Sequence, residues 1–187
     1  MKFMLLGIFI ISSTVAQVPI PGKCPNVQVV PNFDVGKYLG KWYEAERYFA
    51  IFEITGKCVT ADYSSEDNGT VSVLNKQISV LTGIESSIVG YAMQKSSEKA
   101  KLTVVFPTAS KIEGSYWVLD TDYTSYAVVW SCTDIASVFS IRFAWILTRQ
   151  RNSSIAVIEK AYQALDKNDI SRRFFIKTNQ IDCPAEH

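Results

Sequence analysis

Short apolar runs alternate with turn signals along most of the chain. Eight runs rich in β-branched and aromatic residues follow one another with connections of hairpin length, and no helical pattern interrupts them. Such a succession predicts an all-β, antiparallel up-and-down arrangement rather than strands that alternate with helices. The predicted strands are Trp42–Phe49, Cys58–Ser64, Thr70–Ile78, Ser87–Gln94, Lys101–Phe106, Ser115–Asp120, Tyr126–Cys132 and Ile141–Thr148.

The strongest turn signal lies between the second and third predicted strands. Asn68 and Gly69 both tolerate the positive φ of a type I′ turn, so the pair predicts a hairpin tip. Asn68 also begins an acceptor sequon with Gly69 and Thr70, and Asn152 begins a second one. Both sequons lie in predicted exposed turns, so we expect glycosylation of at least one of them.

One amphipathic helix is predicted over residues 153–167, after the last strand. From Ile155 onward its apolar side chains recur at the i, i+3, i+4 and i+7 spacing, and Asn168 and Asp169 end it. Several strands are apolar on both alternating faces, as in Phe143–Leu147, and such a strand needs two hydrophobic partners. We therefore expect one strand face to line a barrel and the other to pack against the helix.

Residues 1–16 have the layout of a secretory signal peptide. Lys2 precedes a short apolar run, and the segment ends with the small side chains that signal peptidase accepts. The run is too short to span a bilayer, and the alternative is a buried N-terminal element. We expect a secreted, extracellular protein in which residues 17–187 form one domain. The proline-rich segment 17–31 is then an extended arm.

Charge and residue types argue against several functions. The chain has 19 Lys and Arg against 18 Asp and Glu, a formal net charge of +1, and lacks a basic run, so no nucleic acid partner is expected. The only histidine is His187. That position leaves no Ser-His-Asp arrangement, Cys-His pair or His-rich zinc site. We therefore expect no metal site, no catalytic residues and no enzyme activity.

The cysteines indicate disulfides rather than metal or redox chemistry. Cys24, Cys58, Cys132 and Cys183 are widely spaced, and none forms a CxxC pair. In a secreted chain an even number of such cysteines predicts two disulfides. The residues alone permit three pairings of the four cysteines.

Three short motifs, in order, resemble the signatures of the lipocalin family. They are the Gly40-x-Trp42 core of residues 32–44, Thr121-Asp122-Tyr123, and Arg149 after the last strand. Within the family, the chain is most similar to apolipoprotein D and its insect relatives, Lazarillo and the bilin-binding type, over nearly all of residues 17–187. The resemblance implies an eight-stranded antiparallel barrel with one C-terminal helix packed outside.

The resemblance also assigns structural roles. It implies the disulfides Cys24–Cys132 and Cys58–Cys183, and it places Gly40, Trp42 and Arg149 at the closed floor of the barrel. There the Arg149 guanidinium would lie over the Trp42 indole, a contact worth ~1–2 kcal/mol when desolvated. The alternative role of these residues is a receptor-facing patch.

The function that the resemblance implies is extracellular binding and transport of a small hydrophobic ligand inside the barrel: a lipid, a steroid-like molecule or a pigment. No cofactor is expected, except that a bilin pigment is the alternative ligand. Two competing hypotheses are a lipocalin-type enzyme and a barrel that its own aromatic side chains fill. Resemblance and strand alternation place these residues on the inner face: Tyr63, Val73, Asn75, Gln77, Val104, Phe106, Tyr116, Val118, Phe143, Trp145 and Leu147.

Two further features bear on ligand and partner. Ser79 stands where apolipoprotein D has an arginine at a strand end, which favours a broad lipophilic, pigment or steroid-like ligand over a fatty acid. The loop after the first strand carries large apolar side chains that form a lid or contact a lipid surface or lipoprotein. Those side chains are Phe49, Ile51, Phe52 and Ile54. Nothing in the sequence indicates an oligomeric state.

Overall fold

The computed structural model describes residues 20–49, 55–67, 69–108 and 110–184. The predicted signal peptide and the apolar loop residues Ile51, Phe52 and Ile54 lie outside this part. The elements are β1 (Ile20–Pro21), α1 (Val35–Tyr38), β2 (Gly40–Tyr48), β3 (Gly56–Ser65), β4 (Val71–Ser79), β5 (Glu85–Gln94), β6 (Lys101–Phe106), β7 (Ser110–Thr121), β8 (Tyr126–Ile135), β9 (Phe139–Thr148), α2 (Ile155–Lys167) and β10 (Phe175–Lys177).

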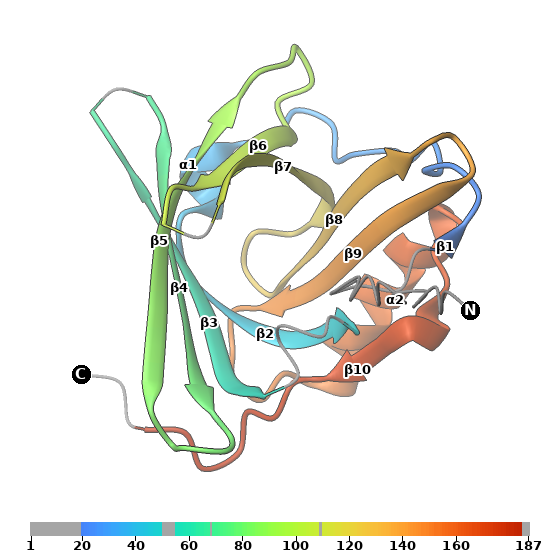
Figure 1. The fold of residues 1–187 in the computed structure, drawn as a ribbon. Coiled ribbons are helices and arrows are strands. Elements are labelled where there is room, and N and C mark those ends of the chain that lie inside the picture. Colours follow the sequence, from blue (N-terminus) through green and yellow to red (C-terminus); the bar gives the residue numbers. More distant parts are fainter. Residues whose placement is uncertain (1–19, 50–54, 68, 109, 185–187) are drawn as a thin grey trace, which may run out of the picture.

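Eight antiparallel strands close into a barrel, as predicted (Figure 1). Strands β2 to β9 pair in chain order, and β2 also pairs with β9. Several strands extend beyond their predicted bounds, most of all β7, which begins at Ser110 rather than Ser115. The turn at Gly69, where φ is +79°, joins β3 to β4 as a hairpin, while Asn68 lies outside the described residues.

Strand β8 buries the side chains of both its faces. This confirms the prediction that one strand face lines the barrel and the other packs against the helix. On β8, Ala127 and Val129 belong to the inner cluster, whereas Val128 and Trp130 belong to the cluster that packs against α2. All four are at most 1% exposed. The period of two therefore separates an interior lining from a helix-facing layer.

Helix α2 lies outside the ring of strands and covers β7 and β8 (Figure 1). It begins at Ile155 rather than at residue 153, because Ser154 is still extended, with φ −67° and ψ 155°, and takes the N-cap position. Ala161, Ala164 and Leu165 form the buried face of the helix. Within the described residues, no helix has the length and apolar character needed to cross a membrane.

The N-terminal arm is fixed to the barrel at several places, of which two are a strand pairing and a disulfide. β1 pairs with β9 through Ile20 and Ser140, a short strand that the sequence pattern does not predict. Further along, Cys24 forms a disulfide with Cys132 on β8. The arm is otherwise without regular structure up to α1, and Val27 packs into the helix-facing cluster.

The C-terminal segment 175–183, called the strap below, completes the barrel wall. Strands β2 and β3 pair only from Gly40↔Tyr63 to Tyr43↔Thr60. Beyond that point β10 pairs with the rest of β2, and the strap continues past the end of β3 (Figure 1). A disulfide between Cys183 and Cys58 on β3 then fastens it, so both bridges follow the implied pairing.

Candidate functional site

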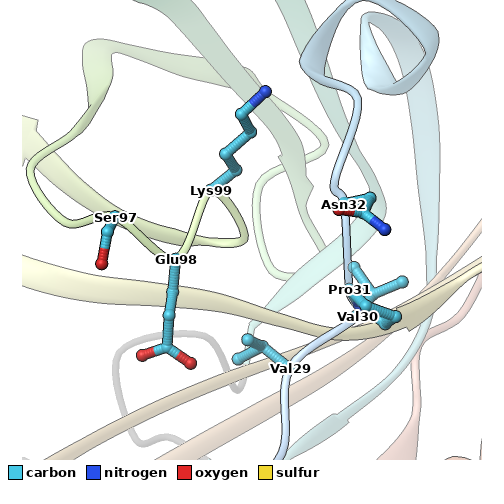
Figure 2. A pocket seen from close by; sticks show the side chains of 7 residues that line it. All are labelled: Val29, Val30, Pro31, Asn32, Ser97, Glu98 and Lys99. Carbon is cyan, nitrogen blue, oxygen red and sulfur yellow. The ribbon is translucent and has the colours of Figure 1, made fainter.

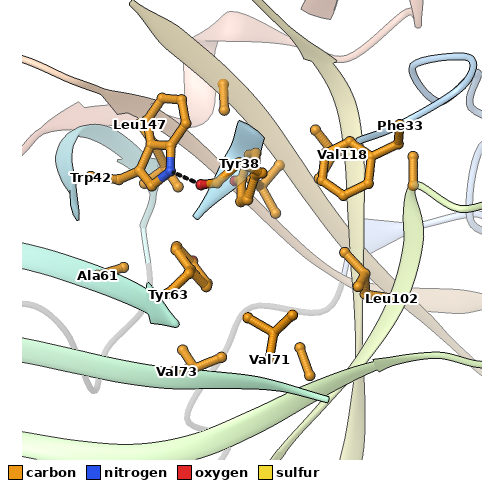
Figure 3. Close-up of a cluster of buried hydrophobic side chains, with 14 residues drawn as sticks. Phe33, Tyr38, Trp42, Ala61, Tyr63, Val71, Val73, Leu102, Val118 and Leu147 are labelled. Carbon is orange, nitrogen blue, oxygen red and sulfur yellow. Dashed lines mark hydrogen bonds between the residues drawn. The ribbon is translucent and has the colours of Figure 1, made fainter. Parts of the chain in front are cut away.

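The floor of the barrel is a tryptophan held between a backbone carbonyl and an arginine side chain. Trp42 is fully buried, and its indole N–H donates to the Tyr38 carbonyl at 2.8 Å (Figure 3). The Arg149 guanidinium lies 3.8 Å from the centre of the indole ring. It also donates to five backbone carbonyls, those of Lys37, Tyr38, Leu39, Lys41 and Tyr123.

Gly40 allows this close approach. Its φ of +89° is unfavourable for a side chain, and a Cβ there would lie 3.4 Å from Arg149 Nη1. The three floor residues predicted from the sequence therefore act together as a structural plug. The contacts of Arg149 leave the guanidinium fully engaged with the chain itself.

All eleven predicted ligand-contact residues lie on the inner face. Residues paired across neighbouring strands point to the same face of the sheet. Pairs such as Tyr63↔Val73, Ala61↔Asn75 and Val129↔Trp145 therefore share the inner face. Eight of the eleven also belong to or pack against the inner cluster: Tyr63, Val73, Val104, Phe106, Tyr116, Val118, Trp145 and Leu147. The three others are placed by alternation and pairing: Asn75, Gln77 and Phe143.

Exposure differs among the residues of this lining. Four of the residues are buried in the inner cluster that also contains Trp42 (Figure 3): Tyr63, Val73, Val118 and Leu147. The other seven are half-buried: Asn75, Gln77, Val104, Phe106, Tyr116, Phe143 and Trp145. Trp42 therefore closes one end of the barrel, and most of the remaining inner lining is partly accessible to solvent. We call this interior the cup.

An aromatic pair stands on the half-buried part of the wall. The rings of Phe143 and Trp145 stack with centroids 5.6 Å apart and planes 2° apart. They follow each other on the inner face of β9. A flat, apolar surface of this kind suits a hydrophobic or conjugated ligand.

Sequence reasoning missed Tyr38, which reaches the cup from the short helix α1. Its hydroxyl lies 2.8 Å from that of Tyr116, and the Tyr63 hydroxyl lies 2.8 Å from Tyr116 on the other side. Burial raises the pKa of all three phenols, so they are neutral at physiological pH. The Asp34 N-cap and the apolar Val35 beside it were the available sequence signals for α1.

A charged pair in the wall was also missed. Glu44 and Arg47 are 2.5 Å apart and almost fully buried, and Thr178 of the strap contacts both at 2.5 and 2.9 Å. Glu44 pairs with Leu147, and Arg47 with Trp145, across β2 and β9. A β-bulge between Glu44 and Glu46 turns Arg47 inward, and strict alternation does not anticipate that shift.

A separate surface cleft of about 290 Å³ lies between the arm and the β5–β6 hairpin (Figure 2). Residues 29–32 face residues 97–99 across it. None of the predicted ligand-contact residues lines this cleft.

The open end of the barrel carries exposed apolar side chains. In an up-and-down barrel the connections β2–β3, β4–β5 and β8–β9 share one end. Leu81 is 81% exposed in the β4–β5 turn, Val138 is 59% exposed in the β8–β9 turn, and Phe49 is 52% exposed after β2. These side chains surround the mouth of the cup.

The fold and the floor define a class: closed eight-stranded barrels with one outer helix and an inward apolar lining. The model of the lipocalin-like domain family matches residues 33–180. Apolipoprotein D of Mus musculus is 42% identical over 168 residues, which cover 87% of this chain and 85% of that protein. The chain therefore belongs to the lipocalin family.

Further relatives agree with this assignment. Lazarillo protein of Schistocerca americana is 34% identical over 161 residues, covering 84% of this chain and 74% of that protein. The solved structure of insecticyanin from Manduca sexta superposes with a TM-score of 0.76 at 24% identity, over 87% of this chain and 89% of that one. At that identity, the structural likeness supports the fold alone.

Proposed function

We propose that the chain binds and carries a small hydrophobic ligand, such as a lipid or a steroid-like molecule, in the cup. The observation that supports this most is the inner lining, which is largely apolar and aromatic, closed by Trp42 at one end and half-buried at seven of its eleven predicted positions. Neutral amides at Asn75 and Gln77 provide the few polar contacts that orient a bound molecule. Membership of the lipocalin family points the same way.

Tryptophan fluorescence tests the proposal because one tryptophan lies on the cup wall. Trp145 faces inward, whereas Trp117 faces outward beneath Lys101. Retinoids, sterols, fatty acids and bilins should include a compound that quenches the emission at micromolar concentration. Trp145→Phe should remove most of that quenching, and Trp117→Phe should leave it. Failure of every class to bind would contradict the carrier function.

We propose binding rather than catalysis. All four cysteines are in disulfides, so none offers a thiol nucleophile. Within the described residues no group of His, Cys, Asp or Glu could hold a metal ion. Thiol titration of the unfolded, unreduced protein should detect no free thiol, and detection of one would reopen the enzyme hypothesis.

We propose that the protein works outside the cell. Two disulfides that close long loops are typical of secreted domains, and residues 1–16 have the layout of a signal peptide. Asn152 is exposed in the turn before α2, where an oligosaccharide would point into solvent. Expression in eukaryotic cells should place the protein in the medium. Retention of the whole product inside healthy cells would contradict the proposal.

The apolar mouth supports contact with a lipid surface or lipoprotein. Leu81 lies at this rim, and Ile155 lies on α2 away from it, yet each is 81% exposed. Leu81→Ser should therefore reduce co-sedimentation with phosphatidylcholine vesicles, and Ile155→Ser is the matched control. Equal sedimentation of both variants and the unchanged protein would instead favour a lid role for the rim.

A bilin pigment is the second candidate ligand, and the stacked pair Phe143–Trp145 favours it because a planar conjugated molecule packs well on such a surface. Purified native protein would then show a visible absorption band. A colourless protein that also fails to bind biliverdin would rule this candidate out.

A further inference from the structure

The hydroxyls of Tyr38, Tyr116 and Tyr63 form a short chain at the deep end of the cup. The two outer oxygens each lie 2.8 Å from the Tyr116 oxygen. The three side chains come from α1, β7 and β3, so distant parts of the chain bring the hydroxyls together. Figure 3 shows Tyr38 and Tyr63 projecting between the walls beside Trp42 and Leu147.

A count of the hydroxyl hydrogens shows how many of them these three tyrosines can donate to a ligand. Three neutral phenols carry three hydrogens, and two hydrogen bonds use two of them. Whichever way the bonds point, one O–H remains to be donated. Among the described residues no further hydrogen-bond partner of these hydroxyls is found. A buried donor without an acceptor is costly, so a ligand oxygen that accepts this hydrogen gains affinity.

The surroundings decide which kind of oxygen fits. Arg47 Nη1 donates to Glu44 and Thr178, and Arg149 donates to backbone carbonyls beyond Trp42. A carboxylate at these hydroxyls would give up its hydration for a single hydrogen bond, whereas a neutral ketone or alcohol oxygen gives up much less.

We propose that Tyr38, Tyr116 and Tyr63 together form a donor site that binds a neutral ketone, aldehyde or alcohol oxygen at the leading end of the ligand and disfavours a carboxylate. This rests on the proposed carrier function and narrows its ligand class. The ligand then enters with its polar end toward Trp42 and its apolar body along Trp145. No single tyrosine is indispensable, because any one remaining phenol still leaves one hydrogen to donate.

Retinoids test the site because the same apolar skeleton is available with four different terminal groups. Fluorescence titration would compare retinol, retinal, retinoic acid and the deoxy hydrocarbon analogue at neutral pH. The unchanged protein should bind retinol and retinal roughly tenfold more tightly than the hydrocarbon or the acid, the effect of about one net hydrogen bond. The variant with all three tyrosines changed to Phe should bind retinol, retinal and the hydrocarbon with similar affinity.

A control variant separates a specific donor site from a general effect of substitution. Tyr91→Phe removes a hydroxyl from the outward face of β5 and should leave the preference unchanged. Persistence of the preference in the triple variant would overturn the donor site and leave the carrier function intact. Failure of all four compounds to bind the unchanged protein would overturn both.

A measurement on the unchanged protein covers the case in which the triple variant does not fold. The infrared carbonyl band of bound retinal should lie below its position in hexane, as expected for an acceptor of a phenol hydrogen bond. A band at the hexane position would overturn the proposal.

Discussion

Phe106 lines the cup because Gly90, across from it on β5, has no side chain. A Cβ on Gly90 would lie 2.5 Å from Cδ1 of the Phe106 ring and 2.5 Å from the Val105 carbonyl oxygen. Neither distance is compatible with a real contact, so the ring occupies the space that any other residue would fill. Gly90 faces inward opposite Val73, which makes it part of the wall.

Gly90→Ala should therefore displace Phe106 and weaken the barrel. We expect a loss of about 1–3 kcal/mol in the free energy of unfolding, the usual effect of an added methyl group in a packed interior. Urea denaturation measures it. Gly114→Ala is the control, because its Cβ would lie 3.4 Å from a flexible Val104 methyl group. An equal loss in the two variants would contradict the specific role of Gly90.

Arg149→Lys should destabilise the floor although it keeps the charge. Lysine cannot reproduce a planar fork that covers Trp42 and donates to five carbonyls. We expect a loss of about 2–4 kcal/mol by urea denaturation. Arg173→Lys, where the guanidinium lies over Phe174 on the surface, should change stability far less. Comparable losses of unfolding free energy in the two variants would show that the contacts of Arg149 stabilise the protein no more than a surface contact does.

Glu44→Gln should leave the buried charge of Arg47 without its counter-ion. Breaking one partner of a buried pair typically costs about 3–5 kcal/mol. The double change Glu44→Gln with Arg47→Met should recover part of that loss, since the unpaired charge is gone. Glu85→Gln breaks an exposed pair with Lys76 and should cost less than about 1 kcal/mol. Thermal unfolding of the unchanged protein and these three variants gives the comparison, and a double variant no more stable than Glu44→Gln would contradict the prediction.

Alkaline pH should destabilise the protein through the buried phenols. Burial raises the pKa of Tyr38, Tyr63 and Tyr116 above the ordinary value of 10.0. The unfolded chain then loses these protons first, so their contribution to stability is complete below about pH 10 and is lost as pH rises through the folded-state pKa. Urea denaturation from pH 8 to 11.5 should show this fall. The triple Phe variant should have a flatter profile, and identical profiles would contradict the assignment.

Gln180→Ala should loosen the strap. Its amide donates to the Glu44 carbonyl at 2.9 Å and to the Val59 carbonyl at 2.8 Å, and so bridges the strands where they no longer pair. We expect faster hydrogen exchange at strap amides such as Thr178, with a stability loss of about 1–3 kcal/mol. Asn179→Ala is the neighbouring control, because Asn179 is exposed and its side chain only accepts from Ile181. Unchanged exchange in Gln180→Ala would show that the disulfide alone holds the strap.

The strand order and the inner face followed from local patterns. Alternation on β9, for example, places Trp145 and Leu147 inside and Ile146 against α2, because the side-chain period of a strand is two. The family resemblance supplied what periodicity does not contain, namely the disulfide pairing and the stacking of Arg149 on Trp42. These contacts join residues far apart in the chain.

The missed residues share a physical reason. Arg47 faces inward because a bulge interrupts the period, and the four-residue helix that carries Tyr38 is too short for a periodic signal. Thr178 and Gln180 lie in a polar segment whose role depends on a gap between β2 and β3. Such a gap exists only in three dimensions.

The strap also sets an order for assembly. Gln180 reaches back 136 residues to Glu44, and the segment that seals the wall follows every strand of the barrel in the chain. While the chain emerges from a ribosome, the eight strands can pair before their last seam is covered. The buried charges of Glu44 and Arg47 therefore stay accessible to water until the final residues arrive. We therefore expect closure of the barrel wall to come late in folding, with the Cys58–Cys183 disulfide then holding the strap in place.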